Sequence, residues 1–141
     1  MQFIPYLGFN GNAREALEFY AKTLGARLDM TAYGDTPAAQ HVPVSAHDRI
    51  MHGVLMLNGS AILMGSDAPA GPAEKVQGMQ VALVLDDVAE GERIFTALAD
   101  GGTTVMPYEK TFWSERFGMC VDRFGTPWMV NAGMVAEASA G

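Results

Sequence analysis

Cysteine is almost missing from this 141-residue chain, where Cys120 is the one example. A single cysteine excludes an intrachain disulfide and a cysteine-rich metal site. We expect Cys120 to be an inert buried thiol between Met119 and Val121, because no nearby cation or helix N-terminus lowers its pKa. Long hydrophobic runs are also missing: no segment approaches the roughly 20 apolar residues of a membrane-spanning helix, and no signal-peptide pattern is visible. These absences predict a cytoplasmic protein without a membrane partner.

The chain also has few basic residues compared with acidic ones. Nine Lys and Arg residues stand against sixteen Asp and Glu, which gives a formal net charge of −7. Neither nucleic acid nor an anionic membrane gains electrostatically from an acidic partner, so we expect no nucleic-acid partner. A Ser-His-Asp arrangement, a phosphate-binding loop and a nucleotide-binding fingerprint are absent too. What the chain does have is 49% hydrophobic residues, which is enough for a substantial core.

The first part of the chain alternates strand and helix signals. Residues 3–9 are a short apolar run that predicts a strand. Asn12 and Glu15 have the spacing of a capping box, and apolar residues then recur at helical spacing as far as Gly25. Glycine after the last apolar position predicts that the helix ends there. Residues 26–33 predict the next strand.

A long excursion follows before the next hairpin. Residues 34–49 contain two prolines and two histidines and predict a partly mobile loop. Strands are predicted at 50–57 and 61–65, joined by Asn58-Gly59, a pair that strongly favours a tight hairpin turn.

The second part of the chain repeats this plan. A strand, a capped helix, a glycine stop and three strands recur at an offset of roughly 75 residues. Asp87 and Glu90 have the same capping spacing as the pair in the first helix. The last two strands form a predicted hairpin at 112–131, with a turn at 122–125.

This repeat predicts an α+β fold with tandem βαβββ modules in a single domain of residues 1–141. We expect the modules at about 1–67 and 78–133. Residues 68–77 would then be a connector, and 134–141 a flexible tail.

The tandem pattern resembles the vicinal oxygen chelate superfamily, which includes glyoxalase I, bleomycin-resistance proteins and extradiol dioxygenases, and within it the PhnB-like branch. The matching segments are 5–20, 51–53, 64–67, 113–118 and 122–128. The resemblance implies a curved mixed sheet around a cleft, and a homodimer. In the metal-dependent members, it also implies four ligands on the first and fourth strands of the two modules.

The resemblance places those four ligand positions mostly on apolar residues. The first-strand position falls on Ile4 or Pro5, and the fourth-strand position falls near Leu63 or Met64. In the second module the positions are Gln80 and Met129. One neutral amide cannot hold a divalent cation that needs several N or O ligands. We therefore expect no metal site and no cofactor.

Six residues are candidates for ligand binding: His52, Met64, Gln80, Trp113, Arg116 and Met129. His52 is either a hydrogen-bonding group or base in the cleft, or a strand histidine satisfied by a carbonyl. Arg116 either clamps an anionic ligand or pairs with Asp122 at the surface. Trp113 either stacks on a flat ligand or fills the core or dimer seam, and the methionines line an apolar cleft or fill the core. No catalytic residue is identified.

These observations predict a protein that binds a small organic ligand in an apolar cleft without the superfamily metal. One alternative is a metal-dependent lyase, isomerase or dioxygenase, in which Gln80 and His52 are joined by Asp67 or Glu115. A second is a non-catalytic dimerisation or scaffold module. The methyltransferase label of some PhnB-like sequences is disfavoured because no glycine-rich methyl-donor site is visible. The sequence identifies neither the ligand nor a reaction.

Overall fold

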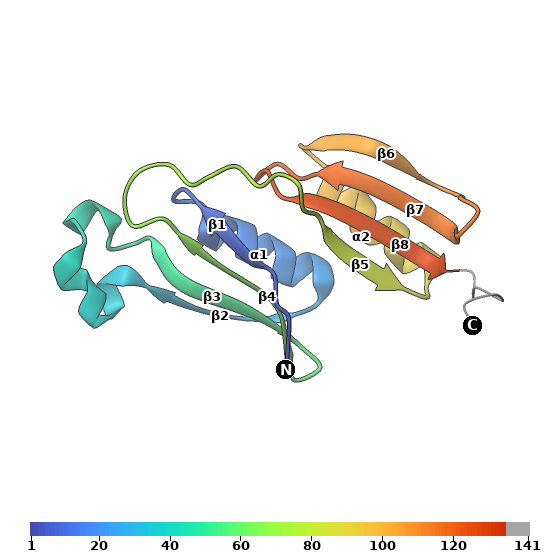
Figure 1. The fold of residues 1–141 in the computed structure, drawn as a ribbon. Helices are drawn as coiled ribbons and strands as arrows, with labels where there is room; N and C mark the ends of the chain where they lie inside the picture. Colours follow the sequence, from blue (N-terminus) through green and yellow to red (C-terminus); the bar gives the residue numbers. More distant parts are fainter. Residues whose placement is uncertain (135–141) are drawn as a thin grey trace. The chain divides into compact units, whose positions relative to one another are not determined.

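The computed structural model describes residues 1–134, and the chain divides into two compact units. We call them the N-terminal module (Met1–Lys75) and the C-terminal module (Val76–Gly141). Each contains a four-stranded sheet with one helix packed against it (Figure 1). The predicted α+β fold, a tandem repeat of βαβββ modules, is confirmed. No helix in the described part of the chain is long and apolar enough to cross a membrane.

The N-terminal module consists of β1 (Tyr6–Phe9), α1 (Ala13–Leu24), β2 (Arg27–Ala32), β3 (Ile50–Leu57) and β4 (Ser60–Asp67). The strand order in its sheet is β1-β4-β3-β2. β1 lies parallel to β4, and the other neighbouring strands are antiparallel. The predicted excursion contains three short 3-10 helices, η1 (Tyr33–Asp35), η2 (Pro37–His41) and η3 (Val44–Ala46).

The C-terminal module consists of β5 (Val81–Leu85), α2 (Val88–Ala99), β6 (Thr103–Glu109), β7 (Ser114–Val121) and β8 (Pro127–Met134). Its strand order is β5-β8-β7-β6, with β5 parallel to β8, so the two modules share one topology. The tail predicted at 134–141 begins inside β8, and its residues after 134 lie outside the described part of the chain.

The helix α1 packs through the apolar stripe that the sequence predicts. Ala13, Ala16, Leu17 and Tyr20 are fully buried, and burial of a large apolar side chain stabilises the fold by about 1.5–3 kcal/mol. The helix ends at Gly25, whose φ of 67° lies in the left-handed region. Glycine takes this conformation without a Cβ clash, as expected for a helix stop.

The start of α1 differs from the prediction. Asn12 precedes the helix, but its side chain caps no backbone N–H. One carboxylate oxygen of Asp67, at the end of β4, instead accepts hydrogen bonds from the N–H groups of Gly11 (2.7 Å) and Ala13 (3.0 Å). Its other oxygen accepts from the N–H of Ile50 at 2.8 Å. The predicted capping box is wrong because a carboxylate from another strand takes over the helix terminus.

The segment between β2 and β3 is fastened to the end of β4. The hydroxyl of Tyr33 donates to the carbonyl of Asp67 at 2.9 Å, and the guanidinium of Arg49 donates to the carbonyl of Ala68 at 2.9 Å. Burial, followed by the charge of Asp67, raises the pKa of Tyr33. The hydroxyl therefore keeps its proton, and its hydrogen bond, at neutral pH.

The turn between β3 and β4 has the predicted geometry. Asn58 and Gly59 have φ values of 52° and 81°. Positive φ at both central residues is characteristic of the tight turn that matches the twist of a two-stranded hairpin.

The C-terminal module follows the sequence prediction more closely. Asp87 caps α2 by accepting a hydrogen bond from the N–H of Glu90 at 3.1 Å. Phe95 and Leu98 are buried. Gly118 in β7 makes room for the helix, because a Cβ at that position would lie 2.7 Å from the ring of Phe95.

A buried aspartate organises the turn between β7 and β8. One oxygen of Asp122 accepts hydrogen bonds from the N–H groups of Phe124 (2.9 Å) and Thr126 (3.0 Å), and the other accepts from the indole N–H of Trp128 (2.8 Å). Asp122 is 3% exposed and Trp128 is 1% exposed. A surface pairing of Arg116 with Asp122, one of the two predicted roles of Arg116, does not hold because Asp122 is buried.

Candidate ligand-binding site

The sheet of the N-terminal module has one face covered by α1 and one open face. Gly53 and Gly65 lie on the covered face, because a Cβ on either would meet the side chain of Leu17 in α1. Side chains alternate along a strand, so His52 and Met64, next to these glycines, point to the other face. This surface, the N-terminal open face, carries Tyr6, Thr31, His52, Val54, Met64 and Ser66.

Tyr6 and His52 meet on the N-terminal open face. The hydroxyl of Tyr6 lies 3.1 Å from Nδ1 of His52, and their rings are 5.8 Å apart and 25° from parallel. Because β4 lies between β1 and β3 in the sheet, the two side chains reach toward each other across β4. Tyr6 pairs with Met64 in the strand register, so the contact forms a polar bridge beside the Met64 thioether.

The hydrogen-bonding capacity of this pair suits it to hold a ligand. A neutral His52 allows two arrangements of the protons. In one, the hydroxyl of Tyr6 donates to Nδ1, and Nε2 carries the ring proton. In the other, Nδ1–H donates to the phenol oxygen, and the hydroxyl proton of Tyr6 makes no bond within the pair. Both arrangements leave one donor for a ligand. Tyr6 is 53% exposed, so a solute can reach it.

Sequence reasoning identified His52 and Met64 but missed Tyr6. The available signal was the alternation in β1, where Leu7 and Phe9 are buried and the residues between and before them point outward.

The C-terminal sheet also has an open face, opposite α2. Since Gly118 faces the helix, Phe117 points to the open side, and the register places Asn131 and Met129 of β8 on the same side. Trp113 packs edge-on against Phe117, with ring centroids 5.2 Å apart. The side-chain oxygen of Asn131 is buried without a hydrogen-bond partner in the described part of the chain. This surface is the C-terminal open face.

Two predicted candidates take other positions. Arg116 pairs with Ala132, whose Cβ lies beneath Gly91 of α2, so Arg116 projects from the covered side of its sheet. Its guanidinium donates to the carbonyl of Glu115 at 2.7 Å. Gln80 is exposed and lies directly before β5 rather than within it. The structure thus brings His52 and Met64 together and separates Arg116 from Met129.

The residues at the metal positions of the superfamily do not fit a divalent cation. The register pairs Tyr6 with Met64 and Ala82 with Met129, so the two methionines hold corresponding places in the two modules. A thioether is a soft ligand and does not replace a carboxylate for such ions. Asp67, one suggested substitute, lies on the covered face and uses both oxygens on backbone N–H groups. Within residues 1–134, no three His, Cys, Asp or Glu side chains are grouped so that they could hold a metal ion.

Cys120 lies on the covered face of the C-terminal sheet and is 1% exposed. Burial, with a smaller contribution from the charge of Asp122, raises the pKa of its thiol to about 11. The thiol is therefore protonated at neutral pH and is a poor nucleophile, as the sequence predicts.

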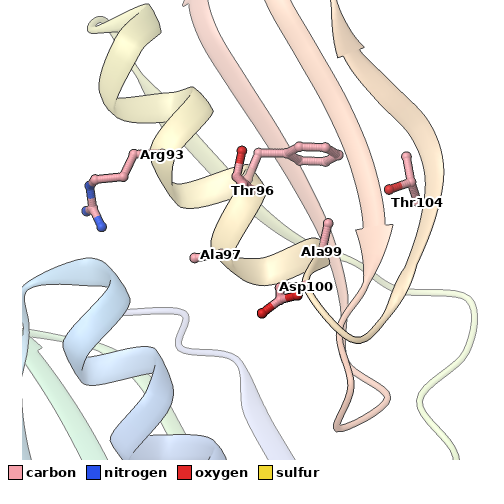
Figure 2. Close-up of a pocket in the computed structure, with 7 residues that line it drawn as sticks. Arg93, Thr96, Ala97, Ala99, Asp100 and Thr104 are labelled. Carbon is pink, nitrogen blue, oxygen red and sulfur yellow. The ribbon is translucent and has the colours of Figure 1, made fainter.

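An open hollow of about 560 Å³ lies beside the C-terminal half of α2. Figure 2 shows that the side chains around it, such as Arg93 and Thr104, point in different directions rather than toward a common centre. The guanidinium of Arg93 is already bonded to Glu90, with its Nε 2.9 Å from a carboxylate oxygen. The hollow therefore offers no converging polar groups, and we place the candidate site on the open faces.

Solved structures share the fold of this chain. The protein PA1353 from Pseudomonas aeruginosa is 47% identical, with a TM-score of 0.84 over 94% of this chain and 97% of that one. The PhnB protein from Bacillus cereus is 21% identical, with a TM-score of 0.77 over 94% and 99% of the two chains. A glyoxylase/bleomycin resistance protein/dioxygenase domain from Frankia shares the fold at 11% identity, with a TM-score of 0.68 over 97% and 94%.

The family follows from the sequence comparison. The family model described as 3-demethylubiquinone-9 3-methyltransferase matches residues 1–131. Protein YjdN of Escherichia coli K12 is 36% identical over 140 residues, which cover 93% of this chain and 95% of that protein. The chain belongs to this family, and it has the fold of the PhnB protein and of the glyoxylase/bleomycin resistance protein/dioxygenase domain.

Proposed function

We propose that the protein binds a small organic ligand on the N-terminal open face, without the superfamily metal. The observation that carries the proposal is the contact between Tyr6 and His52 beside Met64. An apolar surface with a few well-placed polar groups is the usual composition of a small-molecule site. Methionine adapts its shape to an apolar ligand, and the Tyr-His pair supplies the hydrogen bond that orients it.

The experiment is a screen of small aromatic and aliphatic compounds against protein whose methionine methyl groups carry ¹³C. A ligand on the proposed site shifts the methyl signal of Met64, which an M64L variant assigns. We expect H52A to weaken binding of a hit by about tenfold, the value of one hydrogen bond. K22A serves as the control and leaves binding unchanged, since Lys22 is exposed on α1, which covers the opposite face of the same sheet.

Two results would contradict this site. One is a hit whose affinity is the same for wild type, H52A and M64L. The other is loss of binding after EDTA treatment with recovery on addition of Zn²⁺, Mn²⁺, Ni²⁺ or Fe²⁺, which would favour the metal-dependent enzyme. We expect binding to survive EDTA, and elemental analysis to find each metal well below one equivalent.

The family is described by the name of a methyltransferase, 3-demethylubiquinone-9 3-methyltransferase. S-adenosylmethionine therefore belongs in the screen. Binding of this methyl donor, followed by methylation of an added catechol, would replace the binding proposal with an enzyme of that activity.

A homodimer is the second candidate, and the C-terminal module carries the observation that favours it. Val84 is 60% exposed on the C-terminal open face, and Val105 and Met106 of the edge strand β6 are 57% and 39% exposed. Exposed apolar surface of this kind commonly marks a protein interface. Light scattering at micromolar concentration should give twice the chain mass of 15.1 kDa, and a V84E variant should shift the mass toward one chain.

A further inference from the structure

A row of three methionines crosses the C-terminal open face. In the strand register, Met106 of β6 lies opposite Met119 of β7, and Met119 lies opposite Met129 of β8. Residues directly opposite each other in an antiparallel pair point to the same face, with their Cβ atoms about 4.5–5.5 Å apart. The three thioethers therefore stand side by side on one surface of the sheet.

The corresponding row of the N-terminal module lacks this pattern. There Asp29 of β2 lies opposite Val54 of β3, and Val54 lies opposite Met64 of β4. Only the position on the fourth strand is a methionine in both modules, and valine and aspartate occupy the other two places. The open face of this fold does not need three methionines, so the row distinguishes the C-terminal module from its repeat.

The sulfur atoms of the row can be reached from solution and can move toward one another. Met106 is 39% exposed, and Met119 and Met129 are half-buried. Ala82 continues the row on β5, and its methyl group is too short to cover the Met129 thioether. Because methionine is unbranched and has three rotatable bonds, the sulfur atoms can turn toward one ion while the strands stay in place.

The chemistry of this group of ligands selects the ion. Thioether sulfur is a soft ligand, and it suits the soft ion Cu(I) rather than the hard divalent ions that need carboxylates. The thioethers carry no charge, and the net charge of −7 of the chain favours the approach of a cation at long range. We propose that Met106, Met119 and Met129 form a binding site for Cu(I).

This site differs from the metal site that the superfamily resemblance implies. The superfamily ligands come from the first and fourth strands of both modules. The methionine row uses the second, third and fourth strands of one module, which are β6, β7 and β8. It also lies on the other module from the contact between Tyr6 and His52, so it does not depend on the proposed function.

The test titrates Ag(I), which shares the charge and softness of Cu(I) and is not oxidised in air, into protein with ¹³C-labelled methionine methyl groups. A nitrate buffer avoids precipitation of silver chloride, and a C120A background removes the one thiol of the chain. We expect one equivalent of Ag(I) to shift the signals of Met106, Met119 and Met129 and to leave that of Met64 in place. Cu(I) added without oxygen should give the same pattern, and Zn²⁺ should shift none of the four.

Leucine variants remove one sulfur atom at a time and keep the apolar volume. Loss of a group that only orients a metal ligand lowers affinity by about 10- to 100-fold, so loss of a ligand itself in M119L should lower it by roughly 100-fold. M106L and M129L should have a similar effect, and M64L is the matched control that binds as its parent. Competition with a chelator of known affinity measures the change, and circular dichroism confirms that each variant is folded.

Three results would overturn this site. One is an affinity for Ag(I) that is the same in M106L, M119L and M129L as in their parent. Another is binding in wild type that is lost in C120A, which would place the ion on the thiol of the covered face. The third is a ratio of one ion to two chains, which would mean that two copies share the ion. The screen for organic ligands does not depend on any of these results.

Discussion

Each module buries one aspartate that accepts three N–H hydrogen bonds, but the two carboxylates act over different distances along the chain. Asp67 bonds to residues 56, 54 and 17 positions away. Asp122 bonds to residues 2, 4 and 6 positions away. The same type of hydrogen bond therefore joins segments that are distant in the sequence in the N-terminal module. In the C-terminal module it stabilises only a local turn.

The helix starts show the same contrast. Asp87 caps α2 from the adjacent position in the sequence, whereas α1 depends on Asp67 from β4. Hydrogen bonds between residues close in sequence can persist in part when a module unfolds. Hydrogen bonds between residues distant in sequence are lost together. The comparison implies that the N-terminal module is more sensitive to loss of one carboxylate than its repeat.

The largest expected effect is that of D67N. An amide keeps one acceptor oxygen but turns an NH₂ group toward a backbone N–H, so at least one buried hydrogen bond is lost and two donors oppose each other. We expect a loss of about 3 kcal/mol in the free energy of unfolding. Urea unfolding followed by circular dichroism measures it, and a loss below about 1 kcal/mol would contradict the role of Asp67.

D122N should cost less, about 2 kcal/mol, because it breaks bonds that are local in sequence. Both tryptophans, Trp113 and Trp128, lie in the C-terminal module, so their fluorescence reports unfolding of that module. The expected result is that D122N moves the fluorescence transition to lower urea and D67N moves mainly the circular dichroism transition. A larger loss for D122N than for D67N would reverse the comparison.

The two helix starts provide a matched pair of substitutions. D87A removes a side-chain cap and should destabilise the protein by about 1 kcal/mol. N12A removes a side chain that makes no cap and should cost less than about 0.5 kcal/mol. Equal losses in thermal unfolding would show that Asn12 caps α1 in solution after all.

The smallest expected effect concerns the reactivity of Cys120. With a pKa of about 11, about one thiol in a thousand is ionised at pH 8, so labelling by a disulfide reagent is slow and accelerates as the pH rises toward 11. We expect D67N to leave the labelling rate at pH 8 within about twofold of wild type, and D122N to increase it. An equal increase in the labelling rate of Cys120 in D67N and D122N would mean that the two modules unfold as one unit.

The fold could be predicted because its signals are local. The helical stripes, the stop at Gly25 and the Asn58-Gly59 turn each depend on residues a few positions apart, and each is where the sequence predicts it. The roles of Asn12 and Asp67 could not be predicted in the same way. The sequence shows a capping pattern at Asn12, but the bonds that replace it form only when β4 lies beside β1.

The candidate site was predictable in part for the same reason. His52 and Met64 were identified through the motifs around them, and the register confirms that they share a face. Tyr6 was missed because its contact with His52 requires β4 to lie between β1 and β3, an arrangement that no local pattern encodes. Arg116 was a candidate because arginine suits anions, but the strand alternation places it with Ala132 on the helix side.

The parallel pairing of the first and last strand in each module has a consequence for protein synthesis. β1 is synthesised before β4, yet within residues 1–134 its one neighbour in the sheet is β4, where Tyr6 pairs with Met64. Until Asp67 has been made, the start of α1 also lacks the carboxylate that holds it. Each module therefore completes its sheet only when its final strand arrives, and a nascent chain that stalls before β4 exposes the edge and the apolar side chains of β1 to other chains and to chaperones.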